Sequence, residues 1–296
     1  MRSVFDWNIG TRTLLLGKRT LIMGVLNVTP DSFSDGGKFL DKDRAVEHAL
    51  QLLQDGADVI DIGGESTRPG AKTSDAENPI TPGAVSEQEE LDRVIPVIAL
   101  LKQVEPKALI SVDTYKASVA RAAVEAGAEI VNDISGFLWD PKMRKMLAEL
   151  RCGAILMHMR GRPDQWRNLP PASDIVTLVK RELSERVDAA MMAGIKRERI
   201  VLDPGFGFGK NFQENYPLLK RFEEFHGLRY PLLVGISRKS FVGRALARNG
   251  KDAAITERIY GALAAETVAI LKGAHIIRTH DVRICADTIR IADLAS

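Results

Sequence analysis

The stretch Leu21-Ile22-Met23-Gly24-Val25-Leu26-Asn27 is a short apolar run that ends in a polar residue. A run of this length and composition is typical of a buried β-strand. Seven further runs have the same form, which gives predicted strands at residues 21–27, 58–62, 109–113, 129–132, 154–158, 200–203, 232–237 and 275–278. Strands that alternate with helices indicate parallel βαβ units, and eight units predict an α/β fold, the closed TIM (β/α)8 barrel.

Helical spacing separates these runs and predicts helices at residues 41–54, 87–104, 116–125, 141–150, 175–193, 215–224, 252–271 and 282–295. Before the first strand, alternation on either side of Asn8-Ile9-Gly10 predicts a β-hairpin. A barrel of this kind is typically about 250 residues long and forms one domain. We therefore expect a single domain over residues 1–296, with residues 1–19 as an N-terminal hairpin extension.

The composition is that of an ordinary globular protein, with 45% hydrophobic and 27% charged residues. The net charge is only +2, and no block of basic residues appears, so a nucleic-acid partner is not expected. No apolar run reaches the roughly 18 residues of a membrane span, and the first residues do not form a signal peptide. Cys152 and Cys285 lie far apart, which favours reduced, buried thiols and a cytoplasmic protein.

The carboxyl ends of all eight strands meet at one mouth of such a barrel. Polar residues end or follow nearly every run, and they are Asn27, Glu65, Thr67, Arg68, Asp113, Asn132, His158, Asp203, Lys239, Arg278 and His280. Polar groups that are buried without partners cost free energy, so a packed core would not gather so many of them. The pattern therefore predicts an active site at this mouth.

Asp113, Asn132 and Asp203 end three different strands and offer two carboxylates and one amide. Such a set suits a ligand that is rich in N–H donors, such as the guanidine-like edge of a heterocycle. Lys239 supplies a matching donor for a ring carbonyl or nitrogen. The competing interpretation is that the three residues cap the helices that follow, because Asp and Asn are good N-caps.

Arg278 and His280 lie two residues apart and can bind an anion together. The alternative for Arg278 is a surface ion pair with Asp281. Asn27 offers an amide oxygen, which suits a hard cation such as Mg²⁺ that bridges to phosphate oxygens. The role of His158 stays open between the site and the core.

The glycine-rich segment at residues 205–210 matches neither the Walker template nor the dinucleotide template. Its glycines are expected to allow close backbone approach to a flat ligand. The loop at residues 29–37 contains a glycine pair, a phenylalanine and two acids. This composition predicts a lid that excludes water from the site.

Taken together, these segments resemble dihydropteroate synthase of bacterial folate biosynthesis. The resemblance runs from about residue 20 to the C-terminus and rests on seven motifs: LNVTPDSFSDGG at 26–37, DIGGESTRPG at 61–70, SVDT at 111–114, VNDISG at 131–136, DPGFGFGK at 203–210, SRKS at 237–240 and RTH at 278–280. It implies a transferase that condenses 6-hydroxymethyl-7,8-dihydropterin pyrophosphate with 4-aminobenzoate, giving 7,8-dihydropteroate and pyrophosphate by a dissociative substitution.

The resemblance also implies a role for each motif residue. The pterin would be held by Asp113, Asn132, Asp203 and Lys239, with Met157 and Phe208 packed near it. The pyrophosphate and Mg²⁺ would be held by Asn27, Arg278 and His280. The aminobenzoate site, where sulfonamides compete, would be shaped by Thr67, Arg68, Pro69 and Ser237. Asp31 or Asp35 would stabilise the pterin cation. The family further suggests a homodimer through helices near the C-terminus.

The chain departs from the family pattern at residues 72–85, a loop that is often much shorter. This loop lies next to the expected aminobenzoate site. It therefore bears on the expected affinity for aminobenzoate and sulfonamides, but not on the expected pterin site. Two other functions are alternatives. A pterin-dependent methyltransferase barrel would not need the first loop or Ser237-Arg238-Lys239. An inactive pterin-binding paralogue should have lost a residue that binds the anion or a residue of the first loop.

Overall fold

A computed structural model describes residues 2–29, 38–67, 70–73 and 81–296 of the protein, with only the backbone given for residues 38–41. Asp31, Asp35, Arg68 and Pro69 lie outside the described residues, as do residues 74–80 of the 72–85 loop.

Eight parallel strands form the centre of the molecule. They are β3 (Leu21–Asn27), β4 (Val59–Gly63), β5 (Ile110–Asp113), β6 (Ile130–Asp133), β7 (Gly153–Met157), β8 (Ile200–Asp203), β9 (Leu233–Gly235) and β10 (Ile276–Thr279). They are hydrogen-bonded in the order β8-β7-β6-β5-β4-β3-β10-β9. A parallel bridge between Leu202 and Leu232 connects β8 to the start of β9 and closes the ring. The predicted TIM barrel is confirmed.

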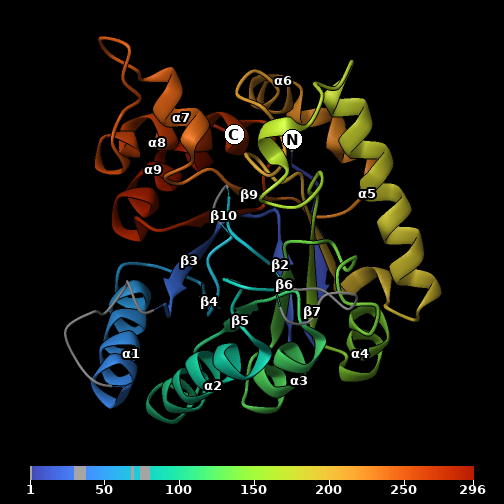
Figure 1. Ribbon diagram of the computed structural model, residues 1–296, viewed down its shortest axis with the longest axis vertical. Coiled ribbons are helices and arrows are strands. Elements are labelled where there is room, and N and C mark those ends of the chain that lie inside the picture. The colour runs from blue at the N-terminus through green and yellow to red at the C-terminus, as the bar shows by residue number, and fades with distance from the viewer. Residues whose placement is uncertain (1, 30–37, 68–69, 74–80) are drawn as a thin grey trace.

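The helices lie around the outside of these strands (Figure 1). They are α1 (Lys38–Gln54), α2 (Glu87–Val104), α3 (Ala117–Glu125), α4 (Met143–Leu150), α5 (Ile175–Met192), α6 (Asn215–Lys220), α7 (Ser240–Ala245), α8 (Ile259–Leu271) and α9 (Val282–Leu294). None of the helices among the described residues is long and apolar enough to cross a membrane.

Most predicted elements are confirmed to within a few residues, but one region is wrong. A single helix was expected at residues 252–271, whereas α8 begins only at Ile259 after a 3-10 turn at Ile255–Arg258. A short helix, α7, precedes it and was not predicted. Its six residues include Gly243, a poor helix former, so the segment gives little periodic signal.

The predicted hairpin is formed by β1 (Phe5–Asn8) and β2 (Thr13–Leu16). The Gly10 amide donates to Asn8 Oδ1 over 2.8 Å, and Gly10 has a φ of 89°, where a Cβ would meet the Arg151 carbonyl oxygen at 2.7 Å. The hairpin shares a hydrophobic cluster with two residues of β3, one residue just before β5 and one residue from each of the other barrel strands. The members are Trp7, Ile9, Leu16, Leu21, Met23, Val59, Leu109, Ile130, Ile155, Val201, Leu233 and Ile276. The hairpin therefore covers the amino ends of the strands and leaves the carboxyl ends for the site.

Glu266 on α8 is an acidic residue inside the packing of α8 against α9. Its side chain is almost fully buried, and Cys285 Sγ donates to its Oε2 over 3.6 Å. Its Oε1 has no hydrogen-bond partner among the described residues. Burial raises the pKa of Glu266 to about 8 from an ordinary value of 4.5, so most of this carboxyl group is neutral at pH 7.

We expect Glu266→Leu to stabilise the protein, and more strongly at pH 8 than at pH 5. The folded protein binds the Glu266 proton more tightly than the unfolded chain, so the stability that this proton provides is present below about pH 4.5 and is lost as the pH rises through about 8. Thermal unfolding at several pH values measures this effect. The variant should flatten the fall in Tm over this range, whereas a parallel displacement of the whole curve would contradict the assignment.

Candidate active site

Four side chains from four strands form a charged network at the carboxyl end of the barrel. Arg278 Nε donates to Asp61 Oδ2 over 2.6 Å, and Arg278 Nη2 donates to Asp113 Oδ2 over 2.7 Å. Asn132 Nδ2 donates to the same Asp61 oxygen over 3.1 Å. The alternative interpretation, a surface pair of Arg278 with Asp281, is wrong, because Asp281 is bound by Arg238 instead.

Asp61 is the residue in this network that the sequence analysis did not select as a site residue. It is fully buried in the middle of β4, and its Oδ1 has no hydrogen-bond partner among the described residues. The signal was a carboxylate within the apolar run Val59-Ile60-Asp61-Ile62, where a charge needs a partner. Asp61 orients both Arg278 and Asn132 through hydrogen bonds, so it supports the side chains that line the mouth.

Helix capping does not account for Asp113, Asn132 and Asp203. The N-caps of α3 and α4 are Lys116 and Lys142, which lie further along the chain than the strand ends. Asp203 Oδ1 accepts the Gly205 amide over 2.7 Å, a local turn bond that leaves Oδ2 for other partners. The three residues therefore stand at the mouth as acceptors.

The electrostatics of these acceptors are set by burial. Burial raises the pKa of Asp113 to about 7, against the lowering effect of Arg278. Burial likewise raises the pKa of Asp203 to about 6, against the Gly205 amide and the positive charges of Lys239, Lys210 and Arg278. Two carboxyl groups that titrate near neutral pH at one mouth are typical of a functional site.

Lys239 lies opposite these carboxylates, and burial lowers its pKa to about 7 with a further lowering by Arg278. Its Nζ lies 3.6 Å from the centre of the Phe208 ring. Arg238, the preceding residue, has a left-handed φ of 61° and bonds Asp281 through Nε at 3.2 Å and Nη2 at 2.7 Å. This ion pair fixes the strained turn that directs Lys239 into the mouth.

An apolar wall stands beside the acceptors. Met157 is buried in a cluster with Tyr115, Ile134, Met159, Trp139, Trp166 and Phe208. The Phe208 and Trp166 rings meet edge to face at a centroid distance of 5.4 Å. A flat apolar wall next to a row of acceptors is suited to a planar heterocycle with N–H groups along one edge.

Ser237 and His280 are in direct contact. The His280 amide donates to Ser237 Oγ over 3.2 Å, and the His280 Nδ1 atom lies 3.1 Å from the same oxygen. Burial, together with the charge of Arg278, lowers the pKa of His280 to about 3, so the ring is neutral at pH 7. The residue expected at the pyrophosphate therefore adjoins the residue expected at the aminobenzoate.

Asn27 ends β3 and is partly buried. Within the described part of the chain no group of three or more His, Cys, Asp or Glu side chains could hold a metal ion. A single amide oxygen does fit Mg²⁺, which keeps several waters and takes other ligands from substrate phosphates. Thr67 follows β4 and is partly buried.

Two glycines of the 205–210 segment allow a close contact with the chain after β7. A Cβ on Gly205 would lie 1.9 Å from the His158 carbonyl oxygen, and one on Gly209 would lie 2.1 Å from that of Arg160. Both residues have positive φ, 69° and 65°. Close backbone approach is therefore required at these two positions, and approach of the segment to a flat ligand stays a prediction.

The described start of the 72–85 loop, with Gly70 just before it, is bonded to the segment that follows β7. The Gly70 amide donates to the Pro163 carbonyl over 3.0 Å, and Arg162 Nη1 donates to Thr73 Oγ1 over 3.1 Å. The Arg162 guanidinium also lies 4.6 Å from the centre of the Trp139 ring. The segment that follows Thr67 is thus held against the residues that follow β7.

Comparisons with known proteins show the family of this chain. Residues 23–280 match the family model described as "Pterin binding enzyme". A dihydropteroate synthase of Synechocystis sp. is 44% identical over 99% of this chain and 92% of its own. A solved dihydropteroate synthase of Xanthomonas albilineans with 4-aminobenzoic acid has a TM-score of 0.86 and 41% identity, over 99% of this chain and 98% of that one.

Fold, site and family model together define a pterin-binding enzyme built on a TIM barrel. The sequence identity to dihydropteroate synthases over nearly the whole chain defines the family within this class. The chain belongs to the dihydropteroate synthase family, and it is a transferase.

We expect Asp61→Asn to lower kcat/KM by at least about tenfold, because the loss of one partner in a buried charge pair costs about 2 kcal/mol or more. Steady-state kinetics with both substrates measures the change. Asp58→Asn is the matched control, since Asp58 just precedes the same strand and bonds Arg19 and the Ile22 amide at the opposite end of the barrel. Equal losses in the two variants would argue against a role of Asp61 at the site.

Proposed function

We propose that the chain condenses 6-hydroxymethyl-7,8-dihydropterin pyrophosphate with 4-aminobenzoate to give 7,8-dihydropteroate and pyrophosphate. The observation that carries this proposal is the set of acceptors at the mouth, of which Asn132 and Asp203 are buried and Asp113 is partly buried, together with the Lys239 donor. The pterin ring presents N–H donors along one edge and a carbonyl oxygen near it, and this pattern complements the set. A solved relative from Xanthomonas albilineans is in complex with 7,8-dihydropteroate.

The pterin would stack against Met157 and Phe208 with its donor edge on Asp203 and Asn132. The pKa of Asp203, about 6, keeps this carboxyl group ionised at pH 7. A charge-assisted hydrogen bond from a ring N–H to a carboxylate is about twice as strong as a neutral one. These contacts bind and orient the ring, and they leave the side chain of the pterin directed toward Arg278 and His280.

Arg278 would bind the pyrophosphate, and its hydrogen bond to Asp61 at the mouth supports this role. His280 lies beside it, with its ring held by Ser237. Asn27 would hold Mg²⁺, which when bound neutralises charge on the leaving oxygens. Arg278 stabilises the pyrophosphate as the bond between the pterin methylene carbon and oxygen breaks and both electrons leave with the oxygen.

The cation left on the pterin methylene would be stabilised by Asp31 or Asp35 from the first loop. The amine lone pair of 4-aminobenzoate then forms the new carbon–nitrogen bond, and the nitrogen loses one proton to water or pyrophosphate. An arylamine is neutral at pH 7, so this attack needs no strong base. Thr67, Arg68, Pro69 and Ser237 would position the aminobenzoate, and sulfonamides would compete there, as a solved Yersinia pestis relative with a sulfonamide complex suggests.

We also propose a cytoplasmic homodimer. Large apolar side chains are exposed on the outer faces of α8 and α9, with exposed fractions of 85% for Tyr260, 68% for Ile291 and 83% for Leu294. Exposed apolar patches of this kind mark protein interfaces. The two cysteines are buried and unpaired, which suits a reducing compartment.

The reaction is tested by pyrophosphate release from purified protein with the pterin pyrophosphate and Mg²⁺, with and without 4-aminobenzoate. We expect release coupled to dihydropteroate formation only when 4-aminobenzoate is present. If the protein binds the pterin but releases no pyrophosphate in either mixture, the chain is an inactive pterin-binding paralogue.

We expect Lys239→Ala to weaken pterin binding by about a hundredfold and to reduce turnover nearly to background. The variant removes a buried donor and leaves Asp113 and Asp203 with one less compensating positive charge, a loss of about 2–5 kcal/mol. Titration calorimetry with the pterin measures the affinity. Lys196→Ala, an exposed lysine between α5 and β8, is the control. An unchanged pterin affinity in Lys239→Ala would refute the role.

A further inference from the structure

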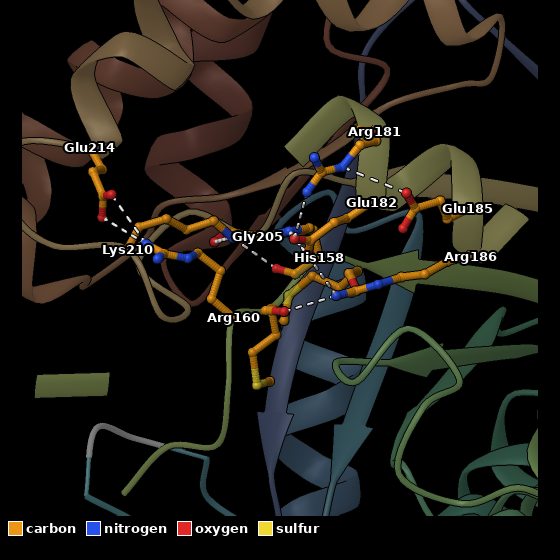
Figure 2. A network of polar contacts seen from close by, with 11 residues as sticks. His158, Arg160, Arg181, Glu182, Glu185, Arg186, Gly205, Lys210 and Glu214 are labelled. Atoms are coloured by element: carbon orange, nitrogen blue, oxygen red, sulfur yellow. Dashed lines mark hydrogen bonds and ion pairs between the residues drawn. The ribbon is translucent and has the colours of Figure 1, made fainter. Parts of the chain in front are cut away.

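A second polar network lies behind the apolar wall, where the segment after β8 meets the segment after β7 (Figure 2). At its centre Lys210 Nζ is fully enclosed. It donates to the Gly205 carbonyl oxygen over 2.7 Å, to the His158 carbonyl oxygen over 2.9 Å, and to His158 Nδ1 over 2.8 Å. The lysine of the glycine-rich segment therefore points into the protein, away from any phosphate.

Three acceptors around one nitrogen indicate the charged form of Lys210. An ammonium group has three N–H donors and uses all of them here, whereas a neutral amine could donate only two. Burial lowers the pKa of Lys210, and the neighbouring Asp203 carboxylate raises it. The geometry points to a buried ammonium whose compensating charge is Asp203.

His158 is held in one protonation state by the same contacts. Its burial, together with the charges of Lys210 and Arg186, lowers its pKa well below the ordinary value, so the ring is neutral. Because the Glu182 carboxylate oxygen Oε2, 3.0 Å from Nε2, can only accept, the proton of the neutral ring is on Nε2, and Nδ1 accepts from Lys210. The ring thus connects the segment after β8 to helix α5.

Arg186 of α5 completes the network on the side of β7. Its Nη1 donates to the Met157 carbonyl oxygen and its Nη2 to that of Met159, each over 2.9 Å. These bonds fix the backbone on both sides of His158. The acceptor for Lys210 is therefore part of a rigid support.

Lys210 connects this support to two residues of the proposed pterin pocket. Gly205, whose carbonyl accepts from Lys210, donates its own amide to Asp203 Oδ1 over 2.7 Å. The same Gly205 carbonyl accepts the Phe208 amide over 3.1 Å. Asp203 and Phe208 are thus both hydrogen-bonded to Gly205, the residue whose carbonyl oxygen Lys210 also binds.

We propose that Lys210 is a positioning residue of the pterin pocket, which holds the 203–210 segment on β7 through His158 and supplies a buried positive charge to Asp203. The inference rests on the proposed function, since it assumes that the pterin binds at Asp203. The charged groups that face Asp203 are Lys239 from the turn after β9, Arg278 from β10 and Lys210 from its own segment. Lys239 and Arg278 would also bind the substrate, whereas the positive charge of Lys210 makes contacts only within the protein.

The test is the pH dependence of pterin affinity in Lys210→Met. The probe is 6-hydroxymethylpterin, which has the ring but no leaving group, and titration calorimetry from pH 5 to 8.5 gives its Kd. The pterin binds the ionised Asp203, so affinity rises with pH through the Asp203 pKa of about 6. Without the Lys210 charge the pKa of Asp203 rises. We therefore expect the rise of pterin affinity with pH to occur about one pH unit higher in the variant, with a larger loss of affinity at pH 6 than at pH 8.

Two further variants separate charge from folding. Lys220→Met removes an exposed lysine of α6 and should leave the profile unchanged. Lys210→Gln keeps an amide donor for the carbonyls but carries no charge, so it should shift the acid limb while its Tm stays nearer to that of the wild type. If Lys210→Met does not fold, the pH profile of Lys210→Gln tests the charge role of Lys210.

A profile identical to that of the wild type in Lys210→Gln would overturn the charge role. A loss of affinity that is equal at every pH would leave Lys210 as a support of the fold only, and would also overturn it. If the wild-type protein fails to bind the pterin at any pH, the proposed function is at fault instead.

Discussion

Closure of the barrel is the constraint on which the site depends. The bridge between Leu202 and Leu232 joins β8 to the start of β9, so the sheet has no free edge there. All strands run in parallel, and their carboxyl ends therefore form one ring. Asp61 and Arg278 are 217 positions apart in the chain, yet their side chains are within 2.6 Å of each other. No local segment could bring these groups together.

The ring encloses more acids than bases, and burial acts on both. It raises the pKa values of Asp113 and Asp203 toward neutrality and lowers that of Lys239 toward the same range. In the structure the Arg278 guanidinium already donates to Asp113. A pterin edge offers the same kind of N–H donors, so binding at Asp113 would replace one planar donor group with another. Asp113 thus has a hydrogen-bond partner before the ligand arrives, which limits the cost of enclosing this carboxyl group at the mouth.

The sequence predicted the barrel well because its signals are local. The run at residues 21–27 coincides with β3, and a chain that alternates such runs with helices admits few topologies. Asp113, Asn132, Asp203 and Lys239 could be selected because each follows an apolar run. Asp61 could not be selected by that rule, since apolar residues stand on both sides of it. The pairing of Lys210 with His158 bridges 52 positions and depends on the glycine contacts between two loops, which no periodicity records.

The two halves of the mouth are supported in different ways. On the proposed pterin side Asp113, Asn132, Asp203 and Arg278 belong to strands, and their positions follow from the sheet. On the proposed aminobenzoate side Thr67 and Ser237 follow strands, and the segment after Thr67 is held by Arg162 and the Pro163 carbonyl. Residues on connecting segments tolerate substitution better than residues of a closed sheet. Changes of sequence can therefore alter the contacts made to the aminobenzoate or to a competing sulfonamide while the pterin pocket stays intact, and the contact of Ser237 with His280 is where such changes would begin to affect turnover.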